Sequence, residues 1–331
     1  MEASQEQALH IDVGQDGLDQ REGEDLLAAF CFSSDTHVRT DSAVIDLCLP
    51  PLGISQLIES WTTPYPVKHR RSGRVRISEG HEHAFAVIQL REAYPADLRS
   101  LTFEAYTEML SAIQSTNCPH IIKIWNYFDR INEEEGGLER YRQFSWARSD
   151  AFERMNVSDD DLPTGTAIGT QGGNTLSLIA LLSRHRLQRF ENPRQVSAYR
   201  YPEQYGPRSP KFSRAGLVES ENQNIFIVSG TAAVIGHQSV HPFDLASQTD
   251  VTFNNLSLLT QVAESFKREK ITPKLDENSA LRVYLRNPAD YPYVEAQLRA
   301  KLKGSPTNVA FLHGDICRSE LEIEIDGVRI I

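Results

Sequence analysis

The most restrictive feature of this 331-residue sequence is an order of short strand-like runs and longer helical stretches that occurs in both halves. In the second half the order is strand, helix, strand, helix, strand, strand. Its strands are expected at residues 224–230, 281–286, 308–312 and 320–325, and its helices at 254–268 and 293–302. The first half mixes the same elements, with strands expected at 42–49, 73–78, 83–90, 121–128 and 176–182 and helices at 98–116 and 137–154. This order predicts an α+β protein with two tandem domains of related build.

Local composition suggests where these domains begin and end. Residues 1–37 are rich in Gln, Glu, Asp and Gly, which predicts a flexible N-terminal lead-in. Residues 38–190 are expected to form an N-terminal α+β domain, and residues 191–331 a C-terminal domain in which two helices cover a mixed sheet. The Gly/Thr-rich stretch 165–173 (GTAIGTQGG) is expected to form a tight turn.

The charge balance and the cysteine pattern argue against several classes of protein. The chain has 45 acidic and 34 basic residues, a net charge of −11, which argues against a general nucleic-acid binder. The four cysteines form no CxxC pair, which argues against a structural zinc site or a disulfide framework. No apolar run reaches the ~18 residues that a membrane-spanning helix needs, and no signal-peptide pattern is visible at the N-terminus. We therefore expect a cytoplasmic protein that binds neither nucleic acid nor a membrane.

Motifs for common cofactors and nucleophiles are missing from the sequence. There is no GxxxxGK[ST] for a nucleotide phosphate, no GxGxxG register and no GxSxG nucleophile elbow. His81 and His83 would share one face of a strand, but the sequence offers no third metal ligand beside them. We expect no metal and no cofactor.

The last predicted strand carries a row of acidic residues. Glu320, Glu322 and Glu324 alternate with Leu321, Ile323 and Ile325, so the three carboxylates share one face. That face is either solvated, which is usual for a half-buried strand, or it points one carboxyl group into a cleft. In a cleft, burial and a like-charge neighbour would keep that carboxyl protonated as a general acid. The spacing alone leaves both interpretations open.

Several blocks between about residue 115 and the C-terminus resemble the chorismatase family. They are NCPHIIKIWNYFDRIN at 117–132, GLERYRQF at 137–144, LPTGTAIGTQGG at 162–173, SAYRYPEQYGPRSPKFSRA at 197–215, SGTAAVIGH at 229–237 and DICRSELEIEIDG at 315–327. The second domain is also similar to reactive-intermediate deaminases, which implies a deaminase-like or chorismate-mutase-like barrel arrangement. The resemblance implies a cofactor-free enzyme that protonates the enolpyruvyl group of chorismate, releases pyruvate and aromatises the ring.

The same resemblance implies roles for particular residues. Glu324 matches the catalytic glutamate of the family, in the sequence EIDG. The two carboxylates of chorismate call for Arg and Tyr donors. The candidates for these donors are Tyr201, Tyr205, Arg208, Arg148 and Arg286.

Two small residues bear on which product is formed. Gly230 and Cys317 match positions that distinguish hydroxybenzoate-forming from diol-forming members. The chain is similar to bifunctional members of aryl-polyene pigment and ubiquinone biosynthesis, which implies 3-hydroxybenzoate and 4-hydroxybenzoate as products.

Two other functions are compatible with the same fold. An enamine or imine hydrolase of the deaminase type would need an Arg where this chain has Asn308. A non-catalytic small-molecule-binding protein would not need Glu324 in its family position. Because two tandem domains could supply the site within one chain, we expect a monomer.

Overall fold

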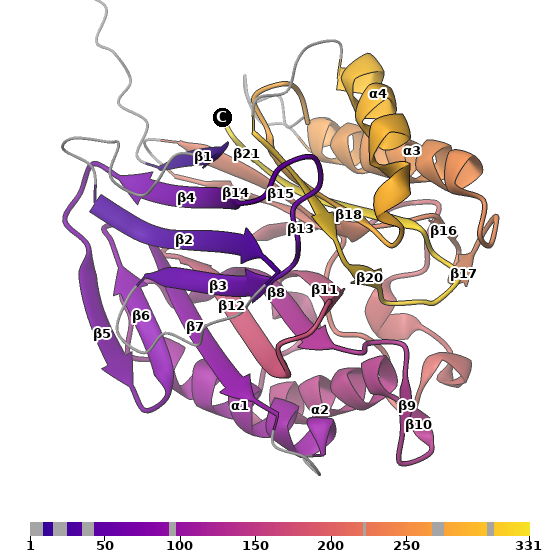
Figure 1. Ribbon diagram of the computed structural model, residues 1–331. Helices are drawn as coiled ribbons and strands as arrows, with labels where there is room; N and C mark the ends of the chain where they lie inside the picture. Colours follow the sequence, from indigo (N-terminus) through magenta and orange to yellow (C-terminus); the bar gives the residue numbers. More distant parts are fainter. Residues whose placement is uncertain are drawn as a thin grey trace, which may run out of the picture.

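The computed structural model describes residues 9–15, 25–34, 43–92, 97–220, 223–266, 275–302 and 308–331. Within these residues, three sheets of four or more strands pack together, and four α-helices lie on the outside of the assembly (Figure 1). This arrangement confirms the predicted α+β class.

The largest sheet has seven strands in the order β20-β11-β8-β12-β7-β6-β5, and only β11 and β8 are parallel neighbours in it. Helices α1 (Leu98–Ile113) and α2 (Arg140–Arg154) share a buried apolar cluster with it, in which Tyr106 and Phe144 pack near Phe128. Asp97 caps α1 by accepting a hydrogen bond from the backbone of Arg99. The strands are β5 (Lys68–Ser72), β6 (Val75–Glu79), β7 (His83–Arg91), β8 (His120–Asp129), β11 (Thr164–Thr170), β12 (Thr175–Ser183) and β20 (Asp315–Ile316).

The second sheet has six strands in the order β13-β14-β15-β21-β18-β19. Its outer face packs against α3 (Leu245–Ser265) and α4 (Tyr291–Leu302). The contact is a separate buried apolar cluster, which includes Leu259, Leu298 and Val283. The first strand begins at Gln188, just before the expected domain boundary at residue 191. The strands are β13 (Gln188–Phe190), β14 (Ala215–Glu219), β15 (Asn224–Thr231), β18 (Ala280–Leu285), β19 (Val309–His313) and β21 (Ile323–Ile330).

A third sheet comes from the N-terminal part of the chain and has the order β1-β4-β2-β3. The expected flexible lead-in, residues 1–37, contributes two of its strands, because the apolar run in β2 buries Phe30 and Phe32 completely. Residues 1–8, 16–24 and 35–37 of that lead-in lie outside the described residues. The strands are β1 (His10–Gly14), β2 (Asp25–Ser33), β3 (Val44–Cys48) and β4 (Leu57–Thr63).

The three sheets meet in one buried core. Phe30 and Trp61 of the four-stranded sheet pack against Phe85 and Trp125 of the seven-stranded sheet, with ring centroids 5.3–6.1 Å apart. Edge-to-face pairs at such distances stabilise a core beyond the area that they bury. The remaining short elements are β9 (Glu134–Glu135), β10 (Leu138–Glu139), β16 (Val234–Ile235) and β17 (Gln238–Ser239), with 3-10 turns at Asp159–Asp161, Ala198–Arg200, Glu203–Tyr205 and Pro288–Asp290.

The stretch 165–173, expected to be a tight turn, is mostly strand. Residues Thr164–Thr170 form β11, parallel to β8, and the turn follows only at 171–174. Its glycines serve close packing, since a Cβ on Gly169 would lie 2.6 Å from Cγ2 of Ile131 and 2.8 Å from Cβ of Asp315. The turn prediction was therefore wrong for β11, because a glycine in a strand can signal a close neighbour as well as a bend.

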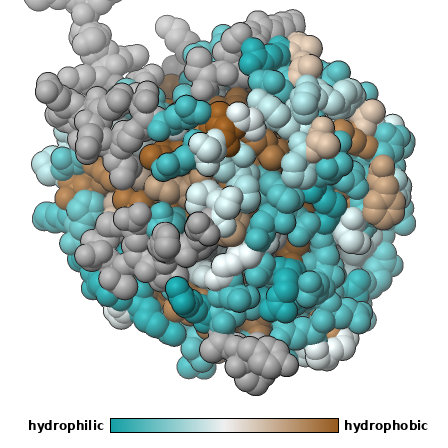
Figure 2. All heavy atoms as spheres, in the orientation of Figure 1, coloured by the Kyte–Doolittle hydropathy of each residue, from teal (hydrophilic) through white to brown (hydrophobic). Residues whose placement is uncertain are grey.

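The face of the molecule drawn in Figure 2 is mainly polar. Of the coloured atoms on the face in Figure 2, most are hydrophilic, and the brown patches are small and scattered. None of the helices in the described ranges is long and apolar enough to cross a membrane.

Candidate active site

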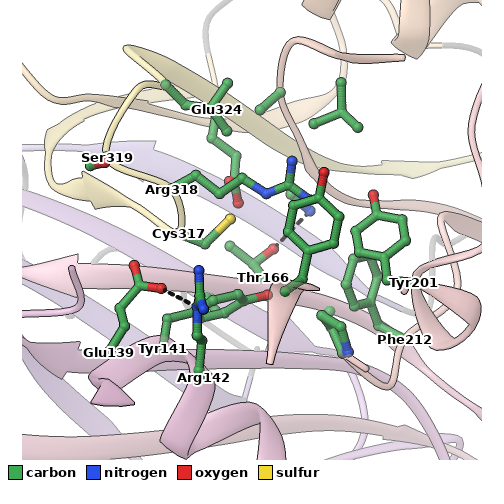
Figure 3. Close-up of a pocket in the computed structure, with 18 of the residues that line it drawn as sticks. Glu139, Tyr141, Arg142, Thr166, Tyr201, Phe212, Cys317, Arg318, Ser319 and Glu324 are labelled. Atoms are coloured by element: carbon green, nitrogen blue, oxygen red, sulfur yellow. Dashed lines mark hydrogen bonds and ion pairs between the residues drawn. The ribbon is translucent and has the colours of Figure 1, made fainter. Parts of the chain in front are cut away.

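A cavity of about 190 Å³ lies where the seven-stranded and six-stranded sheets meet. Its walls come from α2, β11, β15 and β21, from the segment 201–214 and from the loop after β20 (Figure 3). The lining residues are Glu139, Tyr141, Arg142, Arg148, Gly165, Thr166, Ala167, Tyr201, Tyr205, Pro210, Phe212, Arg214, Gly230, Ala232, Val234, Cys317, Arg318, Ser319, Glu320, Leu321 and Glu324.

Glu324 is the only lining carboxyl group that is almost fully buried, with 4% of its surface exposed. It points from β21 toward Thr166 and Cys317 (Figure 3). Burial and the charge of Asp326 raise its pKa from 4.5 to about 8, although the positive charges of Lys123 and Arg214 act in the opposite direction. At neutral pH this side chain is therefore a carboxylic acid with a proton to give.

The carboxyl group of Glu324 lies against the backbone of Gly230, which has no side chain. A Cβ on Gly230 would lie 1.9 Å from Oε1 of Glu324, a distance that real atoms do not reach. Any other residue at this position would push the carboxyl group away from its present place. Gly230 thus sets how deep the acid sits in the cavity.

The neighbouring charge is Asp326 and not Glu322. The strand expected at 320–325 begins only at Ile323 and continues to Ile330, so Glu320 and Glu322 precede it. Glu324 and Asp326 are alternate residues of β21 and share one face, and Asp326 is 1% exposed. Glu322 is not among the lining residues, and its neighbours include Arg286 and Asp290.

A buried hydrogen-bond cluster lies under the cavity floor. Thr166 Oγ1 accepts hydrogen bonds from Nζ of Lys123 (2.9 Å) and from the backbone N of Gly230 (3.1 Å), and donates to Oδ2 of Asp326 (2.7 Å). Nζ of Lys123 also lies 3.8 Å from Oδ2 of Asp326. Burial lowers the pKa of Lys123 to about 8 although Asp326 opposes that change. Thr166, which lines the cavity, is thereby hydrogen-bonded to Asp326 and Lys123, which are buried beneath it.

Two buried arginines face the cavity with unused donors. Nε and Nη2 of Arg148 are buried and make no hydrogen bond within the described part of the chain, and the same holds for Nε of Arg214. Arg148 is 3% exposed, and its guanidinium lies 5.1 Å from the centre of the Phe144 ring. A buried guanidinium with free donors is costly, so a site of this kind is suited to an anionic ligand with carboxylate oxygens.

The rim of the cavity is aromatic and cationic. Nη2 of Arg214 donates to the hydroxyl of Tyr201 (2.5 Å), and the hydroxyl of Tyr205 lies 3.0 Å from Nδ1 of His237. The guanidinium of Arg318 lies 4.2 Å from the Tyr205 ring centre and donates to the carbonyl of His237 (3.0 Å). These contacts fix the segment that carries both tyrosines across the mouth.

The thiol of Cys317 lies beside Glu324 (Figure 3). Burial and the charge of Glu324 raise its pKa from 9.0 to about 12. Cys317 is therefore a neutral, small lining group and not a thiolate nucleophile. Among the described residues no group of three or more His, Cys, Asp and Glu side chains could hold a metal ion.

Two predicted ligands lie outside the cavity lining. Arg208 is half-exposed and pairs with Glu153 (3.1 Å). Arg286 is held by Asp315 (2.7 Å) and by backbone carbonyls, so its donors are already used. Asn308, expected near a deaminase-type site, bonds instead to the backbone of β1, donating to the carbonyl of Ile11 (3.1 Å).

The other predicted residues all line the cavity, and some lining residues were not predicted. Glu324, Arg148, Tyr201, Tyr205, Gly230 and Cys317 come together as expected. Arg214, Arg318, Thr166 and Tyr141 were missed, although all four stand within the blocks that carry the family resemblance. Burial raises the pKa of Tyr141, which therefore stays a hydrogen-bond donor.

Comparison with known proteins gives consistent results. Residues 59–182 match the family described as chorismatase FkbO/Hyg5-like, N-terminal. A 3-hydroxybenzoate synthase of Streptomyces hygroscopicus is 32% identical over 82% of this chain and 80% of its own length, and a chorismatase of Streptomyces rapamycinicus is 33% identical over 82% and 81%. A crystal structure of a chorismatase matches with a TM-score of 0.84 and 25% identity, over 97% of this chain and 98% of that one. The likeness of the C-terminal half to reactive-intermediate deaminases and the two-domain boundary stay predictions.

Proposed function

Because the chain belongs to the chorismatase family, we propose that it removes pyruvate from chorismate and aromatises the ring to a hydroxybenzoate. The observation that carries this proposal is Glu324, a protonated carboxyl group in a cavity with two arginines that have free donors. An acid, two anion-binding groups and a site of small-molecule size are what this reaction needs.

Glu324 acts first as an acid and then as a base. Its proton goes to the methylene carbon of the enolpyruvyl ether, which makes the ether carbon an oxocarbenium centre. The bond between the ether oxygen and the ring carbon then breaks, and pyruvate leaves with that oxygen as its keto group. For 4-hydroxybenzoate the hydroxyl stays on its carbon, and that carbon loses its hydrogen as a proton. For 3-hydroxybenzoate the hydroxyl oxygen first moves to the neighbouring carbon that lost the ether oxygen, and that carbon loses its hydrogen. In both cases one proton leaves as the ring becomes aromatic, and it returns to Glu324. Chorismate thus divides into pyruvate and hydroxybenzoate, and no water is consumed.

The two substrate carboxylates are held by the cationic walls. Arg148 on α2 and Arg214 before β14 offer buried donors from different sides of the cavity. The phenols of Tyr201 and Tyr205 lie beside Arg214 and Arg318 and complete the donor set. Charge-assisted hydrogen bonds of this kind fix the ring relative to Glu324.

The products proposed are 3-hydroxybenzoate and 4-hydroxybenzoate, as precursors for aryl-polyene pigment or ubiquinone biosynthesis. The support is the pairing of Gly230 with Cys317, which leaves the carboxyl of Glu324 deep beside a small thiol. We propose that the enzyme acts as a monomer, because both halves of the chain contribute to the walls of the cavity. We also propose that it acts in the cytoplasm, where its four cysteines would stay reduced.

The test is direct. The purified protein is incubated with chorismate, pyruvate is followed with a coupled lactate dehydrogenase, and the aromatic products are identified by chromatography. We expect equal amounts of pyruvate and total hydroxybenzoate. No pyruvate above background would overturn the proposed function, and a dihydrodiol product would overturn the product assignment.

A further inference from the structure

We propose that Asp326 is a fixed negative charge that keeps Glu324 loaded with its proton, and that two oriented sets of donors hold Asp326 in that state. The inference rests on the proposed function and adds positioning residues, of which only Thr166 lines the cavity. Its basis is the direction in which each hydrogen bond around Asp326 must run.

The first set of donors is Lys123 and Thr166. A threonine hydroxyl has one hydrogen and two acceptor sites. Lys123 and the backbone N–H of Gly230 can only donate, so together they occupy both acceptor sites of Thr166. The single hydrogen of Thr166 must therefore go to Oδ2 of Asp326, 2.7 Å away, which must be an acceptor.

The second set comes from the opposite side, through what we call the buried polar chain: Glu59, Arg282, Tyr127, Tyr284 and Asp326. Glu59 accepts two hydrogen bonds from Arg282, one of them 2.8 Å from Nε to Oε2. Nη1 of Arg282 donates to the hydroxyl of Tyr127 (2.7 Å).

Arg282 cannot accept a hydrogen bond, so it sets the direction of the chain. Every hydroxyl hydrogen of the chain has an acceptor when Tyr127 donates to the hydroxyl of Tyr284 (2.9 Å) and Tyr284 donates to Oδ2 of Asp326 (3.2 Å). Lys123 and both donor sets thus converge on one oxygen of Asp326, which is an arrangement for a carboxylate and not for a carboxylic acid.

Asp326 then acts on Glu324 through their shared strand. The two residues alternate on β21, and in the antiparallel pairing Tyr284 lies opposite Glu324 and Arg282 opposite Asp326. A second negative charge beside the carboxylate of Asp326 is unfavourable, so Glu324 keeps its proton. The other groups that act on Glu324 are Lys123 from β8 and Arg214 before β14, which favour its ionised form, and Cys317 and Tyr141, which are neutral.

Two variants should move the pH profile in opposite directions. Asp326→Asn removes the fixed charge with little change of shape, so the high-pH limb of kcat/KM for pyruvate release should shift down by about 1 pH unit or more. Lys123→Met removes the cation that favours ionised Glu324, while Thr166 and Tyr284 still donate to Asp326, so the same limb should shift up. A purely structural role would lower the rate without opposite shifts. If D326N does not fold, Tyr284→Phe removes one donor to Asp326 and should shift the limb down by less.

The matched control is Asp276→Asn. Asp276 is also a buried carboxylate with an arginine partner, Arg329 at 2.9 Å, but it does not line the cavity. Its replacement should lower stability and leave the pH profile unchanged. If the high-pH limb of kcat/KM lies at the same pH in wild type, D326N and K123M, the inference is overturned.

A second readout does not depend on turnover. Infrared difference spectra recorded against Glu324→Gln should show the carbonyl stretch of protonated Glu324, which should disappear at lower pH in D326N than in wild type. Disappearance at the same pH would overturn the inference even if chorismate is not the substrate. If wild type releases no pyruvate but the carbonyl stretch still disappears at lower pH in D326N than in wild type, only the proposed function is overturned.

Discussion

The cavity and the buried polar chain both contain buried carboxyl, guanidinium and phenol groups, and they differ in how these groups are partnered. In the buried polar chain each member has hydrogen-bond partners. Glu59, for example, accepts hydrogen bonds from Arg282 and from Nε1 of Trp61 (2.7 Å). In the cavity, Arg148 keeps two buried donors unused and Arg214 keeps one. Evolved proteins rarely leave such groups unpartnered without a purpose. The comparison teaches that unmet donors mark binding capacity, whereas satisfied ones mark rigid support.

The change that should separate the two regions most strongly is Glu324→Gln. Removing the transferable proton should lower kcat by roughly 1000-fold or more, measured as pyruvate release from chorismate. Near-normal turnover would move the acid role to another residue and break the comparison.

The same variant should be more stable than wild type at high pH. The folded-state pKa of Glu324 is about 8 and lies above the unfolded value of 4.5. Its contribution to stability is therefore complete below pH 4.5 and is lost as pH rises through about 8. Thermal melts of wild type and E324Q from pH 5 to 9 should diverge in that direction.

In the buried polar chain the largest effect should be on stability. Glu59→Gln leaves the Arg282 guanidinium buried without its counter-charge, which should cost about 3–5 kcal/mol in the free energy of unfolding, measured by urea titration. We expect the KM for chorismate to stay near wild type, because Glu59 does not line the cavity. A large rise in KM with unchanged stability would reverse the roles that we assign to the two regions.

A pair of arginine variants tests the unused donors. Arg148→Gln should raise the KM for chorismate roughly 100-fold through loss of a charge-assisted hydrogen bond. Arg208→Gln is the matched control, since Arg208 pairs with Glu153 at the surface, and such pairs contribute little. If both variants raise KM equally, the cavity is not where the carboxylates bind.

The smallest effect is expected from Cys317→Ala. Enlarging the cavity by one sulfur atom should change the ratio of 3- to 4-hydroxybenzoate a few-fold while total turnover changes less. Chromatography of the products measures both quantities. An unchanged ratio would remove Cys317 from the control of product choice.

Much of the fold could be predicted from the sequence because its signals are local. Apolar periodicity predicted α1, α2 and α4 and the long strands β7, β8, β12 and β15. The glycine-rich β11 was not predicted, because its strand character depends on Ile131 and Asp315 packing against residues without Cβ. The first strands were missed because polar composition hid the apolar run of β2.

The site was predicted in part for a similar reason. Glu324 could be found from a motif, since it needs only a match within its own strand. Asp326 and Lys123 could not, because they meet through the pairing of β21 with β18 and the packing of that sheet on β8. A residue that acts through a partner 200 positions away leaves no local pattern.

The fixed direction of the buried polar chain also decides what it cannot do. A row of hydroxyl groups conducts protons only if each can turn over and pass its hydrogen on, and the end of this row is a guanidinium that does not give up a proton. The row therefore stabilises the charge of Asp326 by hydrogen bonding, but it does not conduct protons to the cavity. The proton that Glu324 gives away must therefore come back from the reactants or through the mouth of the cavity. In the proposed reaction the ring proton of the substrate reprotonates Glu324 in each turnover.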